Sequence, residues 1–327
     1  VLFRSDLEVQ REEEERRKDS GPPRHDDRPE EERATIEALY IDLTGDDEVL
    51  GVRLVPASLR RYLALYEAAM GEAAPEGQTP RSRIQAQVSA LRRAVMSGQL
   101  DPDTAANPFT LDAALHAAGA ALQATELVCS GELRRAFCAV RPPGHHATRS
   151  KAMGFCFFNN AALAVRAALS RHGLTRVALV DFDVHHGNGS EDILAGDERV
   201  LMVSFFQHPL YPYSGAVPKG TNMVNLPIPP YTRGGELREL IEANWMPALN
   251  AFRPQMVFIS AGFDAHREDD LGQLGLVEAD YEWITMRVKD VADRHAKGRI
   301  VSCLEGGYNL SSLARSVAAH LRVLTGV

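Results

Sequence analysis

The stretch Asp181-Phe-Asp-Val-His-His-Gly-Asn-Gly189 directly follows the apolar run from Val177 to Val180. A short apolar run bounded by polar residues is typical of a buried strand. Alternate residues of an extended segment point the same way, so Asp183 and His185 can converge on one ion while Asp181 supports them from behind. We therefore predict a strand that delivers metal ligands at its carboxyl end.

Three other segments repeat this order of an apolar run followed by polar residues. Residues 136–140 lead into Arg141-Pro-Pro-Gly-His-His146, residues 256–260 into Ala261-Gly-Phe-Asp-Ala-His266, and residues 300–304 into Glu305-Gly-Gly-Tyr-Asn309. Ligands of open parallel α/β sheets bind beyond the carboxyl ends of the strands. We expect the four strand ends to build one composite site.

Segments with helical spacing separate these strands. They cover residues 110–130, 159–171, 235–252, 278–295 and 311–324, with Asn159 or Asn160 and Asn309 or Ser311 as candidate N-caps. Strands that alternate with helices pair in parallel through right-handed crossovers. The expected fold is therefore α/β with a parallel sheet.

Composition narrows the class of protein. The chain has 327 residues, of which 45% are hydrophobic, so it can bury a large core. Its formal charge of -8 argues against direct nucleic-acid binding, although an acidic rim would attract a basic protein. The 4 cysteines lack paired metal spacing, which indicates a reducing compartment, and no stretch has the pattern of a membrane span or a secretion signal. We expect a cytoplasmic protein that does not bind a membrane.

The charge pattern also divides the chain. Residues 1–35 are rich in charged residues and interrupted by proline, which predicts a flexible N-terminal arm. The predicted catalytic domain covers residues 36–327.

Asp183, His185 and Asp264 form the expected metal-ligand set. Two carboxylates and one imidazole leave an open position for water, as catalytic zinc sites do. Iron(II) also accepts such a mixed set of oxygen and nitrogen ligands. The residues therefore predict the position of the ion more firmly than its identity.

His145 and His146 are adjacent histidines on a Gly-Pro loop. Hydrolysis requires a group that takes a proton from water and a group that returns one to the leaving group. One imidazole near neutrality could do both, while the other stays charged or orients the water. Asp181 and Asn188 are the expected supports, because Asp raises the pKa of its histidine and Asn leaves its histidine closer to neutral.

Tyr308 follows two glycines, which allow close backbone approach. A phenol there could donate a hydrogen bond to a carbonyl oxygen as negative charge develops on it. We therefore expect Tyr308 beside the metal.

These segments, together with Gly154-Phe-Cys-Phe-Phe-Asn-Asn160, resemble the motif set of the zinc-dependent histone deacetylase family from about Asn107 to the C-terminus. Asn188 and the sequence Glu305-Gly-Gly-Tyr308 resemble the class II branch and the bacterial histone deacetylase-like amidohydrolases. The resemblance implies the arginase and deacetylase fold, a single parallel sheet with helices on both faces. It also implies a deacetylase that hydrolyses the amide of acetyl-lysine or a related N-acyl amine with metal-activated water.

The resemblance further implies individual roles. Zinc would bind Asp183, His185 and Asp264. His146, paired with Asn188, would be the general base and acid, His145, paired with Asp181, would be an electrostatic helper, and Tyr308 would polarise the amide carbonyl.

Substrate and potassium positions are implied in the same way. Gly154, Phe155 and Tyr211 would line a narrow acyl-lysine tunnel, and Asp103 would be the rim acid that grips the substrate backbone. A structural potassium ion would bind near the backbone of Asp181, Asp183, His185, Ser204 and Phe205.

Three alternatives remain open. Acetylpolyamine amidohydrolases share these motifs, so an acetylated protein lysine and an acetylated small amine are both candidate substrates. An acyl-lysine binding module with weak catalysis would keep the metal and the tunnel, and tight binding without product would favour it. A manganese ureohydrolase on the related arginase fold would need ligands for two metals, whereas the sequence shows ligands for one. Relatives often form dimers or tetramers, so the resemblance also allows a homo-oligomer.

Overall fold

The computed structural model describes residues 99–101, 103–107 and 109–326. The predicted N-terminal arm, residues 1–35, lies outside this range, as do residues 36–98 of the predicted catalytic domain. Among the described residues, no helix is long and apolar enough to cross a membrane.

A six-stranded sheet is the centre of the described fold, and all its pairings are parallel. In spatial order it consists of β3 (Arg135–Cys138), β8 (Ile300–Leu304), β7 (Met256–Ala261), β4 (Val177–Asp181), β5 (Val200–Gln207) and β6 (Met223–Ile228). A separate antiparallel pair is formed by β1 (Gln99–Asp101) and β2 (Thr104–Ala105). The predicted parallel α/β sheet is confirmed, but β5 and β6 were not predicted as strands.

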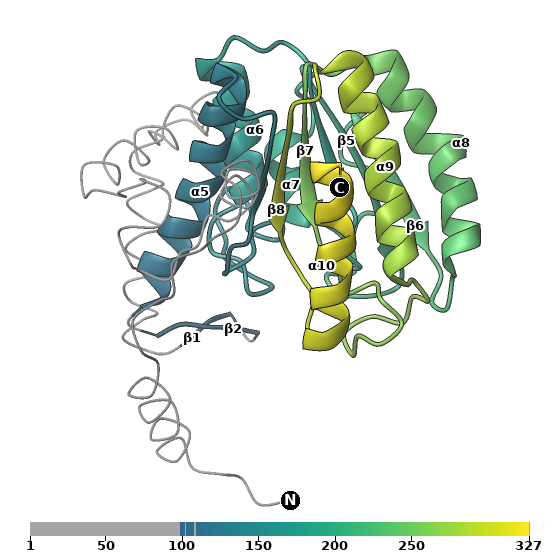
Figure 1. The fold of residues 1–327 in the computed structure, drawn as a ribbon. Coiled ribbons are helices and arrows are strands. Elements are labelled where there is room, and N and C mark those ends of the chain that lie inside the picture. Colours follow the sequence, from purple (N-terminus) through teal and green to yellow (C-terminus); the bar gives the residue numbers. More distant parts are fainter. Residues whose placement is uncertain (1–98, 102, 108, 327) are drawn as a thin grey trace, which may run out of the picture. The chain divides into compact units, whose positions relative to one another are not determined.

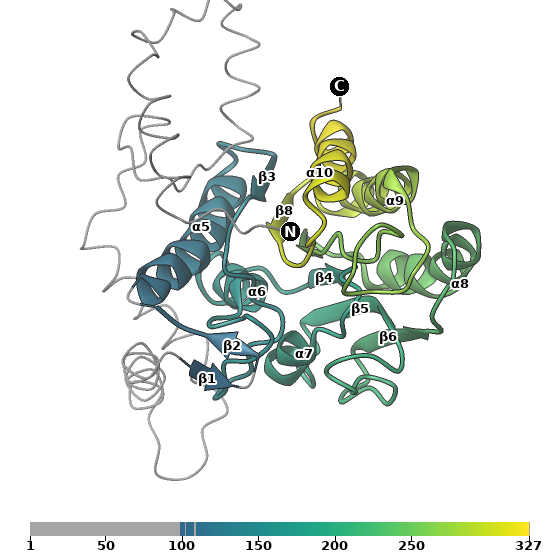
Figure 2. The same cartoon turned by 90° about the horizontal axis from the view of Figure 1, so that it is seen from below.

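Helices cover both faces of the sheet (Figures 1 and 2). One face carries α5 (Thr110–Ser130), α6 (Asn160–Arg171) and α7 (Asn188–Leu194). The other carries α8 (Gly234–Phe252), α9 (Glu278–His295) and α10 (Leu310–Thr325). Two expected N-caps are present: Asn159 accepts a hydrogen bond from the amide of Ala162, and Asn309 accepts one from the amide of Ser312.

The alternation of side chains along β4 explains why the sheet has a core on each face. Val177 and Leu179 pack in the core under α5 and α6, whereas Ala178 and Val180 pack in the core under α8 and α9. All five residues of β4 are buried. A strand covered on both faces must be apolar throughout, which is why this run lacks the polar alternation of a half-exposed strand.

The register of the strands places their carboxyl ends along one edge of the sheet. Asp181 at the end of β4 pairs with Ser204 of β5 on one side and with Ser260 of β7 on the other. Ser260 in turn pairs with Cys303 near the end of β8. The polar segments that follow β4, β7 and β8 therefore leave the sheet at neighbouring positions.

Candidate metal centre and the groups around it

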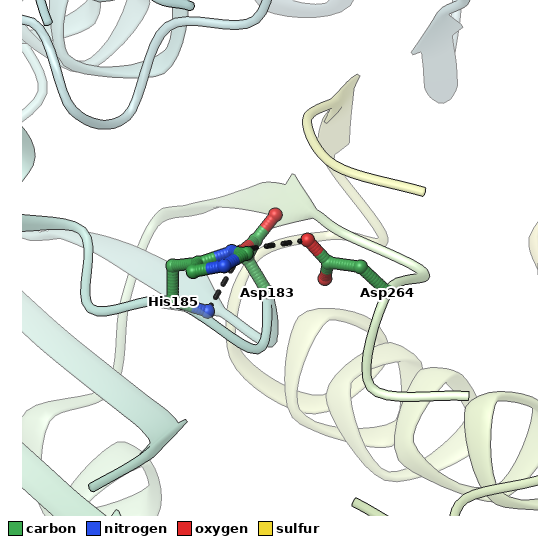
Figure 3. A group of neighbouring side chains, drawn as sticks. All are labelled: Asp183, His185 and Asp264. Carbon is green, nitrogen blue, oxygen red and sulfur yellow. Dashed lines mark hydrogen bonds and ion pairs between the residues drawn. The ribbon is translucent and has the colours of Figure 1, made fainter. Parts of the chain in front are cut away.

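Asp183, His185 and Asp264 converge in the part of the chain that the structure describes (Figure 3). Their ligand atoms all lie within 4.8 Å of one another, and all three residues are buried. His185 Nδ1 lies 3.0 Å from Asp183 Oδ1 and 3.2 Å from Asp264 Oδ2. Asp183 and His185 follow β4, and Asp264 follows β7, so two neighbouring strand ends supply the set.

Backbone groups fix the remaining carboxylate oxygens. The amide of Val184 donates to Asp264 Oδ1 at 2.9 Å, and the amide of Gly306 donates to Asp183 Oδ2 at 2.8 Å. A Cβ atom at Gly306 would collide with Asp264 Oδ2, because the backbone passes so close to the carboxylates. Glycine at this position is thus a requirement of the site's geometry.

The electrostatics of the three groups fit a bound cation. Burial, with the neighbouring charge of Asp183, raises the pKa of Asp264 to about 6. Burial alone would lower the pKa of His185, but its hydrogen bonds and ion pairs with Asp183 and Asp264 raise it to about 10. Two buried carboxylates in contact require compensating positive charge. Two oxygen ligands and one imidazole suit zinc or iron(II).

His145 and His146 lie beside this cluster, with ring centroids 4.0 Å apart. His145 Nδ1 is 3.1 Å from Asp181 Oδ2, and His146 Nδ1 is 2.8 Å from Asn188 Oδ1. Both histidines are buried. The two expected supports therefore contact the two histidines separately.

The pKa values of the two imidazoles are shifted in opposite directions. Burial lowers the pKa of His146 well below its usual value, and the charges of His145 and His185 lower it further. Burial also opposes the charge of His145, but Asp183 and Asp181 outweigh it and raise the pKa of His145 well above its usual value. These directions favour a neutral His146 and a positively charged His145 at neutral pH.

Glu305 is a further buried group of this region, and no separate role was predicted for it from the sequence. Its Oε2 accepts hydrogen bonds from the amides of Gly144 at 2.6 Å and His145 at 3.1 Å, and its Oε1 accepts one from Ser260 Oγ at 2.9 Å. Burial raises the pKa of Glu305 to about 7. Glu305 therefore ties the histidine loop to the ends of β7 and β8.

Tyr308 lies where β8 leads into α10, on the same edge of the sheet. Its ring contacts Phe155 edge to face, with centroids 6.0 Å apart, and the guanidinium of Arg141 lies 5.9 Å from its centroid. Burial, with the charges of Asp264 and Asp183, raises the pKa of Tyr308 well above its usual value. The phenol is therefore a hydrogen-bond donor at every physiological pH.

Gly154, Phe155 and Tyr211 lie around the histidines and Tyr308. The ring of Tyr211 meets that of His146 edge to face at 5.2 Å, and a Cβ atom at Gly154 would collide with the His146 ring. Phe155 is 43% exposed. These contacts are compatible with the predicted tunnel wall, which stays a prediction.

Asp103 and the predicted potassium ligands are also among the described residues. Asp103 Oδ1 accepts hydrogen bonds from the amide of Gly154 at 3.2 Å and from Thr104 Oγ1 at 2.8 Å, so it lies next to the predicted tunnel wall. Its role as a rim acid remains a prediction. Ser204 lies opposite Asp181 in the sheet and is followed by Phe205, so the two segments predicted to bind potassium are neighbours. The potassium ion itself stays a prediction.

Comparison with known proteins gives the family. The histone deacetylase domain matches residues 59–324. A histone deacetylase-like amidohydrolase of Pseudomonas aeruginosa is 39% identical over 237 residues, which cover 70% of this chain and 62% of that protein. A probable deacetylase of Archaeoglobus fulgidus is 40% identical over 219 residues, which cover 65% of this chain and 61% of that protein. The matched region thus spans less than two thirds of either relative.

A solved structure agrees with these sequence relatives. The crystal structure of the HDA15 HD domain superposes with a TM-score of 0.70 at 31% identity, over 84% of this chain and 85% of that chain. The likeness confirms the predicted arginase and deacetylase fold. Because the domain match covers most of the sequence, the chain belongs to the histone deacetylase family.

Proposed function

We propose that this chain is a metal-dependent deacetylase that hydrolyses the amide of acetyl-lysine or of a related N-acyl amine. The observation that carries the proposal is the buried cluster of Asp183, His185 and Asp264 beside two buried histidines, one paired with Asp181 and the other with Asn188. Membership of the histone deacetylase family and relatives named as a deacetylase and an amidohydrolase support the same reaction.

Zinc, with iron(II) as the alternative, would be held by Asp183, His185 and Asp264 and would supply a Lewis acid that activates water and polarises the acyl carbonyl. Because all three ligands are buried, the charge of the bound ion would be shielded from bulk solvent, and its effect on nearby groups would be stronger.

His146 moves the proton in the proposed reaction. Its Nδ1 hydrogen is donated to Asn188 Oδ1, so Nε2 of the neutral ring is the free acceptor. His146 takes a proton from the attacking water as the oxygen–carbon bond forms. It then gives this proton to the amine nitrogen as the carbon–nitrogen bond breaks, and the products are a carboxylic acid and an amine, which at neutral pH become a carboxylate and an ammonium ion.

His145 and Tyr308 stabilise the charge that develops during this step. The imidazolium of His145, paired with Asp181, places a fixed positive charge beside His146. The protonated phenol of Tyr308 donates to the carbonyl oxygen as that oxygen becomes negative. Neither group has to change its protonation state.

The substrate is an acetylated protein lysine or an acetylated small amine, and we propose the protein lysine as the first candidate. A formal charge of -8 favours basic partners, and acetylated lysines of basic proteins are surrounded by positive charge. A small acetylated polyamine is itself cationic, so it is the second candidate.

Turnover of an acetyl-lysine peptide and of N-acetylputrescine, measured in parallel, tests the proposal. The protein is loaded with zinc or iron(II), and a chelator-treated sample with matched protein concentration is the control. We expect metal-dependent release of acetate, with the peptide preferred. Preference for acetylputrescine would assign the chain to polyamine deacetylation. If the metal-loaded protein binds acetyl-lysine but releases no acetate, the chain is an acyl-lysine binding module and not a deacetylase.

A further inference from the structure

The segment that carries Tyr308 is held at several points by groups from outside it. It runs from Gly306 to Asn309, between the end of β8 and the start of α10. The carbonyl of Gly307 accepts a hydrogen bond from Arg141 Nη2 at 2.9 Å, and the amides of Tyr308 and Asn309 donate to Asp269 Oδ2 at 2.7 Å and 3.0 Å. A single carboxylate oxygen therefore accepts hydrogen bonds from two consecutive backbone amides of this segment.

The carboxylate of Asp269 accepts hydrogen bonds from the Tyr308 segment and from its own loop. It is only 5% exposed, and its second oxygen accepts a hydrogen bond from the amide of Leu271 at 3.1 Å. A buried carboxylate with three amide donors is well compensated and strongly oriented. Its environment is therefore that of a buried carboxylate and not that of a surface charge.

The Tyr308 segment needs an anchor because its own backbone is permissive. Gly306 and Gly307 precede Tyr308, and Gly307 has a φ of 136°, outside the range that other residues readily adopt. Two consecutive glycines leave the direction of the following peptide weakly determined. The hydrogen bonds from the amides of Tyr308 and Asn309 to Asp269 fix the direction of the backbone after the two glycines.

Asp269 also links Tyr308 to the metal-ligand loop. It lies five positions after Asp264 in the loop that follows β7, and its amide donates to the carbonyl of His266 at 2.9 Å. The loop that presents the ligand Asp264 therefore also grips the backbone of Tyr308. The loop from Asp264 to Asp269 therefore connects the position of the metal ligand Asp264 to the position of the Tyr308 phenol.

We propose that Asp269 is a positioning residue that holds the Tyr308 phenol at its working distance from the metal ligands, an inference that rests on the proposed deacetylase function. Within the described part of the chain, the hydrogen bonds of the Asp269 carboxylate go to backbone amides of the Tyr308 segment and of its own loop, so we infer that it acts through Tyr308 and not on the substrate.

Asp269→Asn is the test variant because it keeps the shape and removes one acceptor. An amide side chain has one carbonyl oxygen, so its NH2 group must face either Leu271 or the Tyr308 and Asn309 amides, which are all donors. Asp270→Asn is the matched control, since Asp270 is the next residue and is exposed. It removes the same charge without touching the Tyr308 segment.

We expect Asp269→Asn to lower kcat on the acetyl-lysine peptide by roughly 10- to 100-fold with little change in KM, since small misplacement of a catalytic group has this effect. Asp270→Asn should keep the wild-type kcat. Hydrogen exchange of the peptide covering residues 306–309 should become faster in Asp269→Asn and stay unchanged in Asp270→Asn. Equal kcat and equal exchange in Asp269→Asn and wild type would overturn the inference.

A double-mutant cycle separates positioning from a general structural defect. In a Tyr308→Phe background the phenol is already lost, so Asp269→Asn should lower kcat further by no more than about twofold. Losses that multiply would mean that Asp269 supports the whole site and not Tyr308. If Asp269→Asn does not fold, Asp269→Ser, which retains one small acceptor, replaces it in the same cycle.

The two proposals fail in different ways. A wild-type protein without acyl-amine turnover refutes the deacetylase function, whereas the exchange of residues 306–309 still tests the anchor. An active wild-type protein with an indifferent Asp269→Asn variant refutes the anchor alone.

Discussion

His145 and His146 are neighbours in sequence and in space, yet the structure gives them opposite chemistry. Each places Nδ1 against an oxygen of a residue that follows or ends β4, at 3.1 Å for Asp181 and 2.8 Å for Asn188. The two contacts have similar geometry, and only one of the two oxygens carries a charge. The pKa of His145 is raised and that of His146 is lowered. Burial lowers both pKa values, and only His145 has enough carboxylate charge around it, from Asp183 and Asp181, to outweigh that burial.

The largest expected effect comes from removing one member of the pair. His146→Ala should lower kcat by about 10²- to 10⁴-fold, because the proposed reaction loses its proton carrier. His145→Ala should cost less, since that imidazolium transfers no proton. Steady-state turnover of the acetyl-lysine peptide measures both, with exposed His116→Ala as the control. Equal losses for the two variants would contradict the division of roles.

Making the two supports alike is the next test. Asn188→Asp places a carboxylate against His146, raises its pKa and keeps it protonated at neutral pH. Because the free base is the active form, the acidic limb of the kcat/KM profile should move to higher pH, and activity at pH 7 should fall by about 10- to 100-fold. An unchanged pH profile would show that His146 is not the titrating base.

The reverse change makes both supports neutral. Asp181→Asn removes one of the carboxylate charges that, together with Asp183, raise the pKa of His145, and we expect about a tenfold loss of kcat with the acidic limb left in place. Metal content, measured by elemental analysis, serves as the control because Asp181 is also near the ligand loop. A loss as large as that of His146→Ala would mean that His145 does more than supply charge.

Another buried histidine, His320, extends the comparison and gives the smallest effect. His320 contacts only hydroxyl groups through its ring nitrogens, Thr285 at 2.8 Å and Ser302 at 2.9 Å, and burial lowers its pKa to about 3. The unfolded chain binds a proton below about pH 6.5 while the folded protein does not, so this residue lowers stability as pH falls from there toward 3.

Urea unfolding at pH 7 and pH 5.5 measures this contribution. In His320→Gln the free energy of unfolding should depend less on pH, by at most about 1.4 kcal/mol per pH unit. Exposed His116→Gln provides the matched control. An unchanged pH dependence in His320→Gln would mean that folding does not lower the pKa of His320.

The strands that end in polar clusters were predictable, and the others were not. β3, β4, β7 and β8 each lead into such a cluster, and the predicted runs coincide with them within a few residues. β5 has an apolar run of its own, but no comparable ligand cluster follows it. β6 is an edge strand that contains Pro227 and is only partly buried, so its sequence lacks a strand pattern.

The sequence by itself determined which residues are candidates for the proposed chemistry, because the candidate metal ligands, the paired histidines and their supports are residue types placed after apolar strands. The two neighbouring aspartates of the Arg267-Glu-Asp-Asp270 run mark the limit of this reasoning. A charged run predicts a solvated surface, which holds for exposed Asp270, whereas Asp269 is buried and receives the amides of Tyr308 and Asn309. Only the tertiary structure decides between them, since the donors that compensate a buried carboxylate come from a segment about 40 positions away in the chain.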